Sequence, residues 1–387
     1  MNSSAILRDS HAAWLLAAVE LFFSLSWVVY VIFLPDLLAR GGVDRRYLPW
    51  VLAADQLLFA LADWWMGVAV DRARSALRRI GPPLLLLSAI SAGALLLLPH
   101  LAATPQLFLA MTSLWVATSS ALRAPPYVLL SHYAGRSAMP RLAGIQLLGL
   151  AAASASAPYL AIVLKGVDPA LPFVFSAAAV AVSAMALVIV ERAQPLEPLT
   201  TVPHPEAGQT FSRAALFLLL IALLLAFGQQ VHTAINSASQ FKRVADPALL
   251  TWLMPVFWIG FSFGLLAVDR FVRAHGTLHV LRLACVGGAL ALTATALAGS
   301  LALLIAVQFA AGTFWGFILS TAIGFATERG SPLRTGRHTG ALMATLAVAA
   351  LSRLTLSTAA GTGVSVIVEW SPAIMWATAA LLLWRVR

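Results

Sequence analysis

The chain has 387 residues, of which 60% are hydrophobic and 10% are charged, with a mean hydropathy of +0.88. A soluble globular domain has about 25% charged residues, so this composition excludes a soluble protein and predicts an integral membrane protein. The net charge of +10 could suggest nucleic acid as a partner. Nearly all Arg and Lys residues, however, lie in short gaps between apolar runs, as membrane topology requires. We therefore expect contact with membrane lipid and no nucleic-acid partner.

Twelve apolar runs are long enough to cross a bilayer, which takes about 20 helical residues. Glycine and proline interrupt several runs, and this is tolerated where neighbouring helices cover the freed backbone groups. The predicted fold class is an all-α integral membrane protein with twelve transmembrane helices. They are expected near residues 12–38, 48–70, 82–101, 105–130, 141–164, 170–190, 213–238, 248–268, 278–299, 301–326, 338–360 and 363–384.

Positive residues are divided unevenly between the two sets of loops. Most arginines fall on the side that holds both ends of the chain, whereas the opposite side has Arg40, Arg45, Arg46, Lys165, Lys242 and Arg243. By the positive-inside rule, both termini are predicted to be cytoplasmic. An even number of membrane crossings agrees with this orientation.

Residues 191–212 form the only long polar stretch and contain four prolines. Such a segment cannot bury enough apolar surface to fold alone, so it is predicted to be a cytoplasmic linker. It would join an N-terminal six-helix bundle, residues 1–190, to a C-terminal one, residues 213–387.

The second apolar run ends in a charged turn, Gly67-Val-Ala-Val-Asp71-Arg72, with further arginines at positions 74, 78 and 79. This segment resembles the signature loop of the major facilitator superfamily, which reads Gly, three residues and Asp-Arg between the second and third membrane helices. Arg74 stands where that pattern prefers another glycine. The resemblance implies two pseudo-symmetric six-helix bundles around a substrate site at mid-membrane.

The second half repeats the tripeptide that ends this run, with Val268-Asp269-Arg270 echoing Val70-Asp71-Arg72. A carboxylate at the cytoplasmic end of a helix can meet the N-terminus of a helix from the other half. The resemblance implies a conformational latch of this kind that favours the outward-open state. Its expected residues are Gly67, Asp71, Arg72, Asp269 and Arg270, and the alternative is that the two acids are solvated loop residues.

Acidic residues inside apolar runs are costly in a membrane and are functional candidates. Asp63 is the strongest, because it lies too deep for its short side chain to reach the surface. Glu20 and Asp55 are the other coupling candidates, and Glu369, close to the outer surface, is a fourth acid inside a run. A carboxylate balanced between burial and a nearby arginine can load and release a proton. The segment Asp63-Trp-Trp-Met-Gly67 is similar to Asp-Pro-x-x-Gly of the sugar:cation symporter branch, whose acid binds the coupling cation. A structural helix–helix ion pair is the alternative for each acid.

Two arginines also lie inside apolar runs, Arg123 in the fourth and Arg353 in the eleventh. Arg123 resembles a buried arginine on that helix in proton-coupled members of the superfamily. Because arginine stays charged in a protein, each needs a counter-charge. A carboxylate such as Glu20 or Asp63 could supply it, as could an anionic substrate.

Other polar and aromatic residues of the runs are expected to line or wall a cavity. The substrate-site candidates among them are Gln146, His232, Asn236, Trp27 and Tyr30. His232 with Met254 could suggest a soft metal such as copper. Two ligands without a local metal motif do not make a site, so no metal site is predicted.

The chain has no H-E-x-x-H or G-x-x-x-x-G-K-[ST] motif, so we expect neither enzyme activity nor a cofactor. The expected function is secondary active transport of a small molecule across a bacterial inner membrane by a monomer, coupled to protons or another monovalent cation. Export of an amphipathic or toxic compound and uptake of a small organic anion, sugar or metal ion remain alternatives. A non-transporting scaffold or receptor is the alternative from another class.

Overall fold

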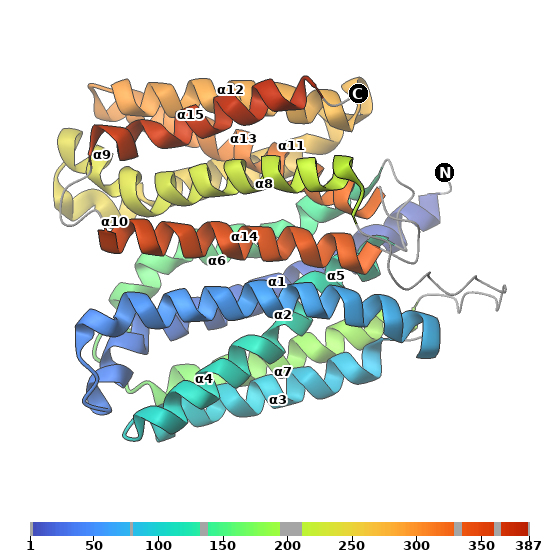
Figure 1. Ribbon diagram of the computed structural model, residues 1–387, viewed down its shortest axis with the longest axis vertical. Coiled ribbons are helices and arrows are strands. Elements are labelled where there is room, and N and C mark those ends of the chain that lie inside the picture. The colour runs from blue at the N-terminus through green and yellow to red at the C-terminus, as the bar shows by residue number, and fades with distance from the viewer. Residues whose placement is uncertain are drawn as a thin grey trace.

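The computed structural model describes residues 3–77, 80–131, 138–193, 211–328, 335–359 and 365–385. Long helices run side by side along one direction, and the described residues form no β-strand (Figure 1). The first half of the chain holds α1 (Ser3–Arg40), α2 (Leu48–Leu77), α3 (Gly81–Leu101), α4 (Pro105–Ser119), α5 (Ala124–Ser131), α6 (Met139–Val163) and α7 (Ala170–Arg192). The second half holds α8 (Arg213–Val231), α9 (Ser237–Val244), α10 (Leu250–Leu253), α11 (Pro255–His275), α12 (Thr277–Leu297), α13 (Leu301–Glu328), α14 (Thr335–Ala359) and α15 (Val366–Leu383).

Eleven helical segments of the described chain are long and apolar enough to cross a membrane. The twelfth crossing helix is α14, which has 25 residues and spans about 37 Å, more than the ~30 Å of the hydrocarbon core. It runs beside α2 and α8 along the length of the bundle (Figure 1). Helices suit this setting because every backbone polar group must find its partner inside the protein. The prediction of an all-α membrane fold with twelve crossings is confirmed.

The helices pack as two bundles. In the first, α1 packs on α6 and α7, and α3 packs on α4 and α7; in the second, α12 packs on α13 and α15, and α8 packs on α14 and α15. The bundles meet where α2 packs on α14 and where α6 packs on α11. Residues 194–210 of the predicted linker lie outside the described residues, so the domain boundaries 1–190, 191–212 and 213–387 stay a prediction.

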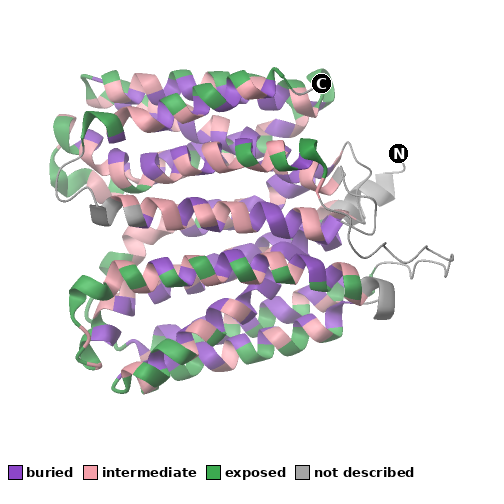
Figure 2. Ribbon diagram, in the orientation of Figure 1, coloured by how far each residue is buried: buried purple, intermediate pink, exposed green. Residues whose placement is uncertain are grey.

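The outer surface of the bundle is apolar. Large side chains such as Phe175, Leu266 and Leu381 are exposed, and exposed residues recur along the outward faces of the helices (Figure 2). In water such a surface would drive aggregation, whereas in a bilayer it faces acyl chains. This agrees with a protein that crosses the membrane many times.

The fourth membrane span is broken at its centre. After α4, a 3₁₀ turn covers Ser120–Leu122, and α5 begins only at Ala124. The cause lies in Pro125 and Pro126, which have no backbone N–H to donate to the carbonyls of the preceding turn. Arg123 is the residue at the break, where irregular backbone is tolerated because it borders protein and not lipid.

The seventh span is also irregular. A π-helical turn, His232–Asn236, separates α8 from α9. Such turns insert one extra residue into a helix and are frequent at functional sites. Both irregular spans carry candidate residues from the sequence.

Candidate functional site

A cavity of about 430 Å³ lies between the two bundles. It is lined by α1, α2, α5 and α6 of the first half and by α8, α11, α13 and α14 of the second. On α2 the lining residues run from Leu52 to Phe59, in the first half of that helix, and on α14 they run from Met343 to Leu354. The cavity therefore extends from the middle of the bundle toward one of its two ends. This is the end opposite to the one where α1 begins and α15 stops.

The opposite end is closed by glycines that let helices of the two halves touch. A Cβ atom on Gly340 would lie 2.5 Å from the carbonyl oxygen of Asp63, and one on Gly336 would lie 2.5 Å from that of Gly67. On the other edge, a Cβ atom on Gly144 would lie 2.8 Å from the Leu265 carbonyl oxygen. No side chain fits at these crossings, so α2 meets α14, and α6 meets α11, backbone to backbone.

The two strongest charged candidates form an ion pair. Arg123 Nε lies 3.1 Å from Asp63 Oδ2. The Asp63 side chain is completely buried, whereas the Arg123 side chain keeps 16% of its surface exposed and lines the cavity. The guanidinium carbon also lies 4.3 Å from the centre of the Phe59 ring, a favourable contact for a cation.

Glu20 reaches the cavity beside this pair. Its carboxylate accepts a hydrogen bond of 3.5 Å from the hydroxyl of Tyr127, and both residues line the cavity. Gly149 on α6 allows α1 to approach closely at this level. The buried side chain of Gln146 lies beside Glu20 but is not among the lining residues. Asp63, Arg123, Glu20 and Tyr127 thus form one charged cluster at the floor of the cavity.

Asp55 lies apart from this cluster. It is buried and accepts a hydrogen bond of 2.8 Å from the hydroxyl of Tyr30. The Tyr30 ring packs against those of Trp27 and Trp115, at centroid distances of 5.4 and 4.8 Å. Of these four residues only Trp27 lines the cavity. Asp55 and Tyr30 are therefore buried partners of each other within the first bundle.

Arg353 reaches the cavity from α14, on the opposite bundle from Arg123. Its Nε atom is buried and has no hydrogen-bond acceptor among the described residues. Arg123 and Arg353 thus line the same cavity from opposite bundles, and their role as substrate or counter-charge residues stays a prediction.

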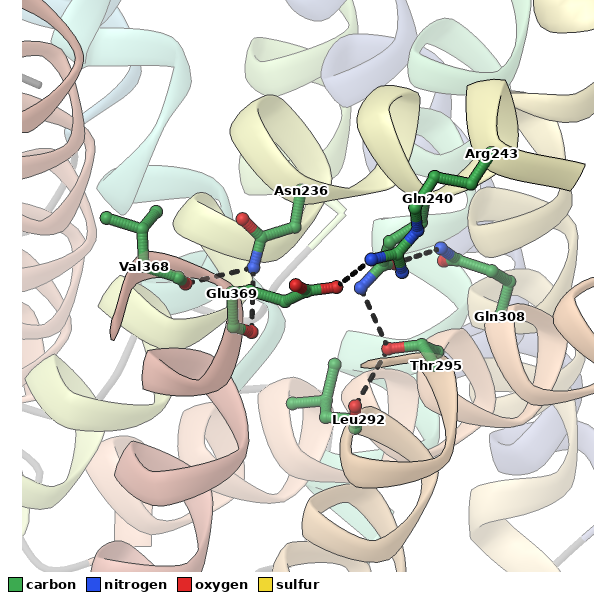
Figure 3. A network of polar contacts seen from close by, with 8 residues as sticks. All are labelled: Asn236, Gln240, Arg243, Leu292, Thr295, Gln308, Val368 and Glu369. Atoms are coloured by element: carbon green, nitrogen blue, oxygen red, sulfur yellow. Dashed lines mark hydrogen bonds and ion pairs between the residues drawn. The ribbon is translucent and has the colours of Figure 1, made fainter. Parts of the chain in front are cut away.

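His232 and Asn236 lie outside the lining of the cavity, in a buried polar network of the second bundle. His232 Nε2 and Gln308 Oε1 are 2.8 Å apart, and the Gln308 amide nitrogen donates to Ser237 and Gln240, each at 3.2 Å. Figure 3 shows the neighbouring part, where Asn236 donates to the backbone carbonyls of Val368 and Glu369, each at 3.1 Å.

This network ends at an ion pair between Arg243 on α9 and Glu369 on α15, 2.6 Å apart (Figure 3). Sequence reasoning did not connect its members. A signal was present, because His232, Asn236 and Gln240 recur every four residues and so share a helix face. The predicted absence of a metal site is not tested by the structure; within the described chain no three His, Cys, Asp or Glu side chains gather as a metal site would need.

Asp71 binds the start of a helix from the other half. Its two carboxylate oxygens accept hydrogen bonds from the backbone N–H groups of Gly336 and Arg337, at 2.8 and 2.9 Å. These N–H groups belong to the first turn of α14, where a negative charge is favourable. Gly67, one turn earlier on α2, makes the close approach described above.

Asp269, which corresponds to Asp71 in the second half, makes a different contact. It pairs with Arg273, 2.7 Å away and one turn further along the same helix. Arg72 and Arg270 are exposed at the ends of their helices. Arg78 and Arg79 of the predicted loop lie outside the described residues. The latch role of these residues stays a prediction.

The sequence reasoning missed Tyr127 and the glycine pair Gly336 and Gly340. Tyr127 lies on α5, four residues after Arg123 at the break, and the Gly-x-x-x-Gly spacing of the pair is typical of closely packed membrane helices. Both signals were visible, but only the packed structure shows which helix each one faces.

Comparison with known proteins gives likeness at the level of structure alone. No family model matches the sequence, and no curated protein matches it. The human organic anion transporter MFSD10 aligns at 14% identity over 97% of this chain and 99% of its own, with a TM-score of 0.74. A bacterial homologue of the iron transporter ferroportin, in an outward-facing state, aligns at 12% identity over 97% and 98%, also with a TM-score of 0.74.

A variant of the E. coli fucose:proton symporter FucP aligns at 13% identity over 95% of this chain and 97% of its own, with a TM-score of 0.68. A proton:xylose symporter of the major facilitator superfamily, XylE, covers 100% of this chain at 12% identity, with a TM-score of 0.72. Likenesses at such low identity establish the fold. The chain has the major facilitator fold, as the loop from Gly67 to Arg79 predicted.

Proposed function

We propose that this chain is a secondary active transporter that moves a small solute by alternating access and is coupled to protons. The observation that carries the proposal is the charged cluster at the floor of a cavity between two bundles. Asp63 is completely buried, Arg123 pairs with it, and Glu20 lines the same cavity. Charged groups at this depth are expensive in a membrane protein and mark solute or proton pathways.

The two carboxylates have separate roles in this proposal. Glu20 lines the cavity, where it exchanges protons with water and meets the solute. Asp63 lies behind Arg123 and holds the guanidinium in place. When Glu20 takes up a proton, the charge balance around Arg123 changes, and this change is the step that couples proton movement to the solute.

Alternation needs a contact between the bundles that can break and re-form. The backbone crossing of α2 and α14 and the two hydrogen bonds from α14 to Asp71 close one end of the bundle. In this proposal they stabilise the state that is open at the other end, and transport requires their release. The positive-inside distribution of Arg and Lys supports a cytoplasmic location for the closed end. This orientation places both termini in the cytoplasm, and the proposed location is a bacterial inner membrane.

The test is flux in vesicles. Purified protein is reconstituted with a pH-sensitive dye inside, a panel of organic acids, sugars and amphipathic cations is added in turn, and proton movement is recorded with and without an imposed pH gradient. We expect one class of solute to move protons in wild-type vesicles, and its direction relative to the gradient separates uptake from export. Glu20→Gln is expected to abolish proton-driven flux while solute exchange across the vesicle membrane persists.

A scaffold or receptor on the same fold is the competing function. It predicts that no solute of the panel moves protons and that Glu20→Gln and Asp63→Asn change no measurable flux. That outcome would remove the transport proposal and leave the fold unaffected.

A further inference from the structure

The cavity contains an arginine that has no counter-charge among the described residues. Arg353 projects from α14 into the lining, and its Nε atom is buried without an acceptor. No carboxylate of the described chain lies within ion-pair distance of its guanidinium. Arginine cannot release its charge by losing a proton, and a buried charge without a partner is strongly unfavourable. Arg353 is therefore prepared for an anion that the described chain does not supply.

Two other arginines that lie between helices have a carboxylate partner. Arg123 has Asp63 at 3.1 Å, and Arg243 has Glu369 at 2.6 Å even though its side chain is 46% exposed. Arg353 lies deeper than Arg243, yet it has no carboxylate. Among the described lining residues Glu20 is the only acid, and Tyr127 of the first bundle already donates to it.

The walls of the cavity are mostly apolar and include three tryptophans. Trp258 of α11 and Trp315 of α13 line the cavity from the same bundle as Arg353, and Trp27 lines it from the other. Met343 and Leu346 on α14 add aliphatic surface. Ligand sites combine such walls with a few polar groups that fix the orientation of the ligand. Here the charged group on the second bundle, Arg353, is a planar fork of N–H donors, which matches the two oxygens of a carboxylate.

We propose that the cavity binds an organic anion, with its carboxylate on Arg353 and its apolar, preferably aromatic, body against Trp27, Trp258 and Trp315. This inference rests on the proposed transport function in one respect, because it takes the bound anion to be the transported solute. A neutral sugar would leave the guanidinium without a counter-charge, and a cation would be repelled by it. A small inorganic anion would leave the apolar walls in contact with water.

The test is binding to purified full-length protein in detergent, which needs no gradient. The probes are 3-phenylpropionate, its neutral amide, acetate and chloride, measured by isothermal titration and by the shift in the thermal unfolding midpoint. We expect 3-phenylpropionate to bind and to raise the midpoint, and the amide to bind at least ten times more weakly. Arg353→Met is expected to weaken binding of the acid by about 10- to 100-fold.

Two further readouts separate binding from a structural role. Without ligand, Arg353→Met is expected to unfold at a higher temperature than wild type, because it replaces an unpaired buried charge with an apolar chain of similar length. Arg353→Lys keeps the charge but loses the planar fork, and we expect it to bind the acid with intermediate affinity. Arg192→Gln removes an exposed arginine at the end of α7 and controls for the change in net charge.

Several results would overturn the proposal. They are equal binding of the acid and its amide, unchanged binding by Arg353→Met, no binding by 3-phenylpropionate, and binding of chloride or acetate as tight as that of 3-phenylpropionate. Failure here is distinguishable from failure of the transport proposal. A protein that binds the acid through Arg353 but carries no flux in vesicles is an anion-binding protein, whereas flux of a neutral solute without acid binding keeps transport and removes the anion.

Discussion

Arg123 Nε lies 3.1 Å from Asp63 Oδ2, so an arginine that faces the cavity is held by a carboxylate that is completely buried on α2. The same helix carries Gly67 and Asp71 at successive steps of four residues, and positions so spaced share one helix face. Asp63 and Gly67 touch α14 through their carbonyl oxygens, and Asp71 does so through its carboxylate. One face of α2 therefore connects the charged floor of the cavity to the closed end of the bundle.

The ion pair predicts an unequal response to single and double substitution. Arg123→Met leaves the Asp63 carboxylate buried without its counter-charge, and we expect it to lower the free energy of unfolding by about 3–5 kcal/mol. The double variant Asp63→Asn with Arg123→Met removes both charges and is expected to recover most of this loss without recovering flux. Thermal unfolding in detergent measures the first effect and the vesicle assay the second. Additive losses of stability in the double variant would contradict the pairing.

The hydrogen bonds of Asp71 predict a shift between conformations. Asp71→Ala removes the acceptor for two N–H groups at the start of α14, a loss of about 0.5–2 kcal/mol, or about 2- to 30-fold in the conformational equilibrium. We expect a smaller fraction of the variant than of the wild type to be in the state that is open at the end opposite the termini. A cysteine introduced at Gln56 in the cavity reports this state through its rate of labelling by an impermeant maleimide, because the native Cys285 is buried.

Asp168→Ala is the control for that experiment. Asp168 accepts a hydrogen bond of 2.8 Å from the Ala170 N–H at the start of α7, within one bundle. The chemistry is similar, but no contact between bundles is lost, so the labelling rate is expected to stay at the wild-type value. An equal effect of the two variants would show that Asp71 acts on local stability alone.

The glycine crossing predicts that added bulk opens the closed end. A Cβ atom on Gly340 would lie 2.5 Å from the Asp63 carbonyl oxygen, so Gly340→Val must push α2 and α14 apart. We expect slower labelling of the cysteine at Gln56 and a flux reduced at least tenfold. Gly93→Val on α3 is the matched control, because nothing lies within 4 Å of a Cβ atom there. Wild-type labelling in Gly340→Val would mean that this crossing does not control access.

The hydrogen bond from Tyr30 to Asp55 predicts a loss of stability. Tyr30→Phe leaves a buried carboxylate without the hydroxyl at 2.8 Å, at a cost of about 1–3 kcal/mol. The measurement is the thermal unfolding midpoint in detergent. Tyr159→Phe is the control, because that ring is only partly buried and packs on Trp252 near the surface. An unchanged midpoint for Tyr30→Phe would show that Asp55 is satisfied by another group.

The sequence by itself determined the membrane class, the twelve crossings and the fold, because lipid imposes length and hydropathy on each span separately. It also identified Asp63, Arg123 and Arg353 as candidate site residues, because a charged residue inside an apolar run can be recognised without a structure. The loop at Asp71 was recognisable for a similar reason, since its spacing is local.

Only the tertiary structure decided which of these groups meet. Asp63 and Arg123 are 60 positions apart in the sequence, and their pairing depends on how α2 and the broken fourth span rotate against each other. The rotation of α1 against α2 turns Tyr30 and Asp55 toward each other and away from the cavity. The rotation of the seventh span places His232 and Asn236 in a network of the second bundle. The rotation of each helix is set by the close packing of many side chains at once. The periodicity of one helix does not specify which other helices pack against it.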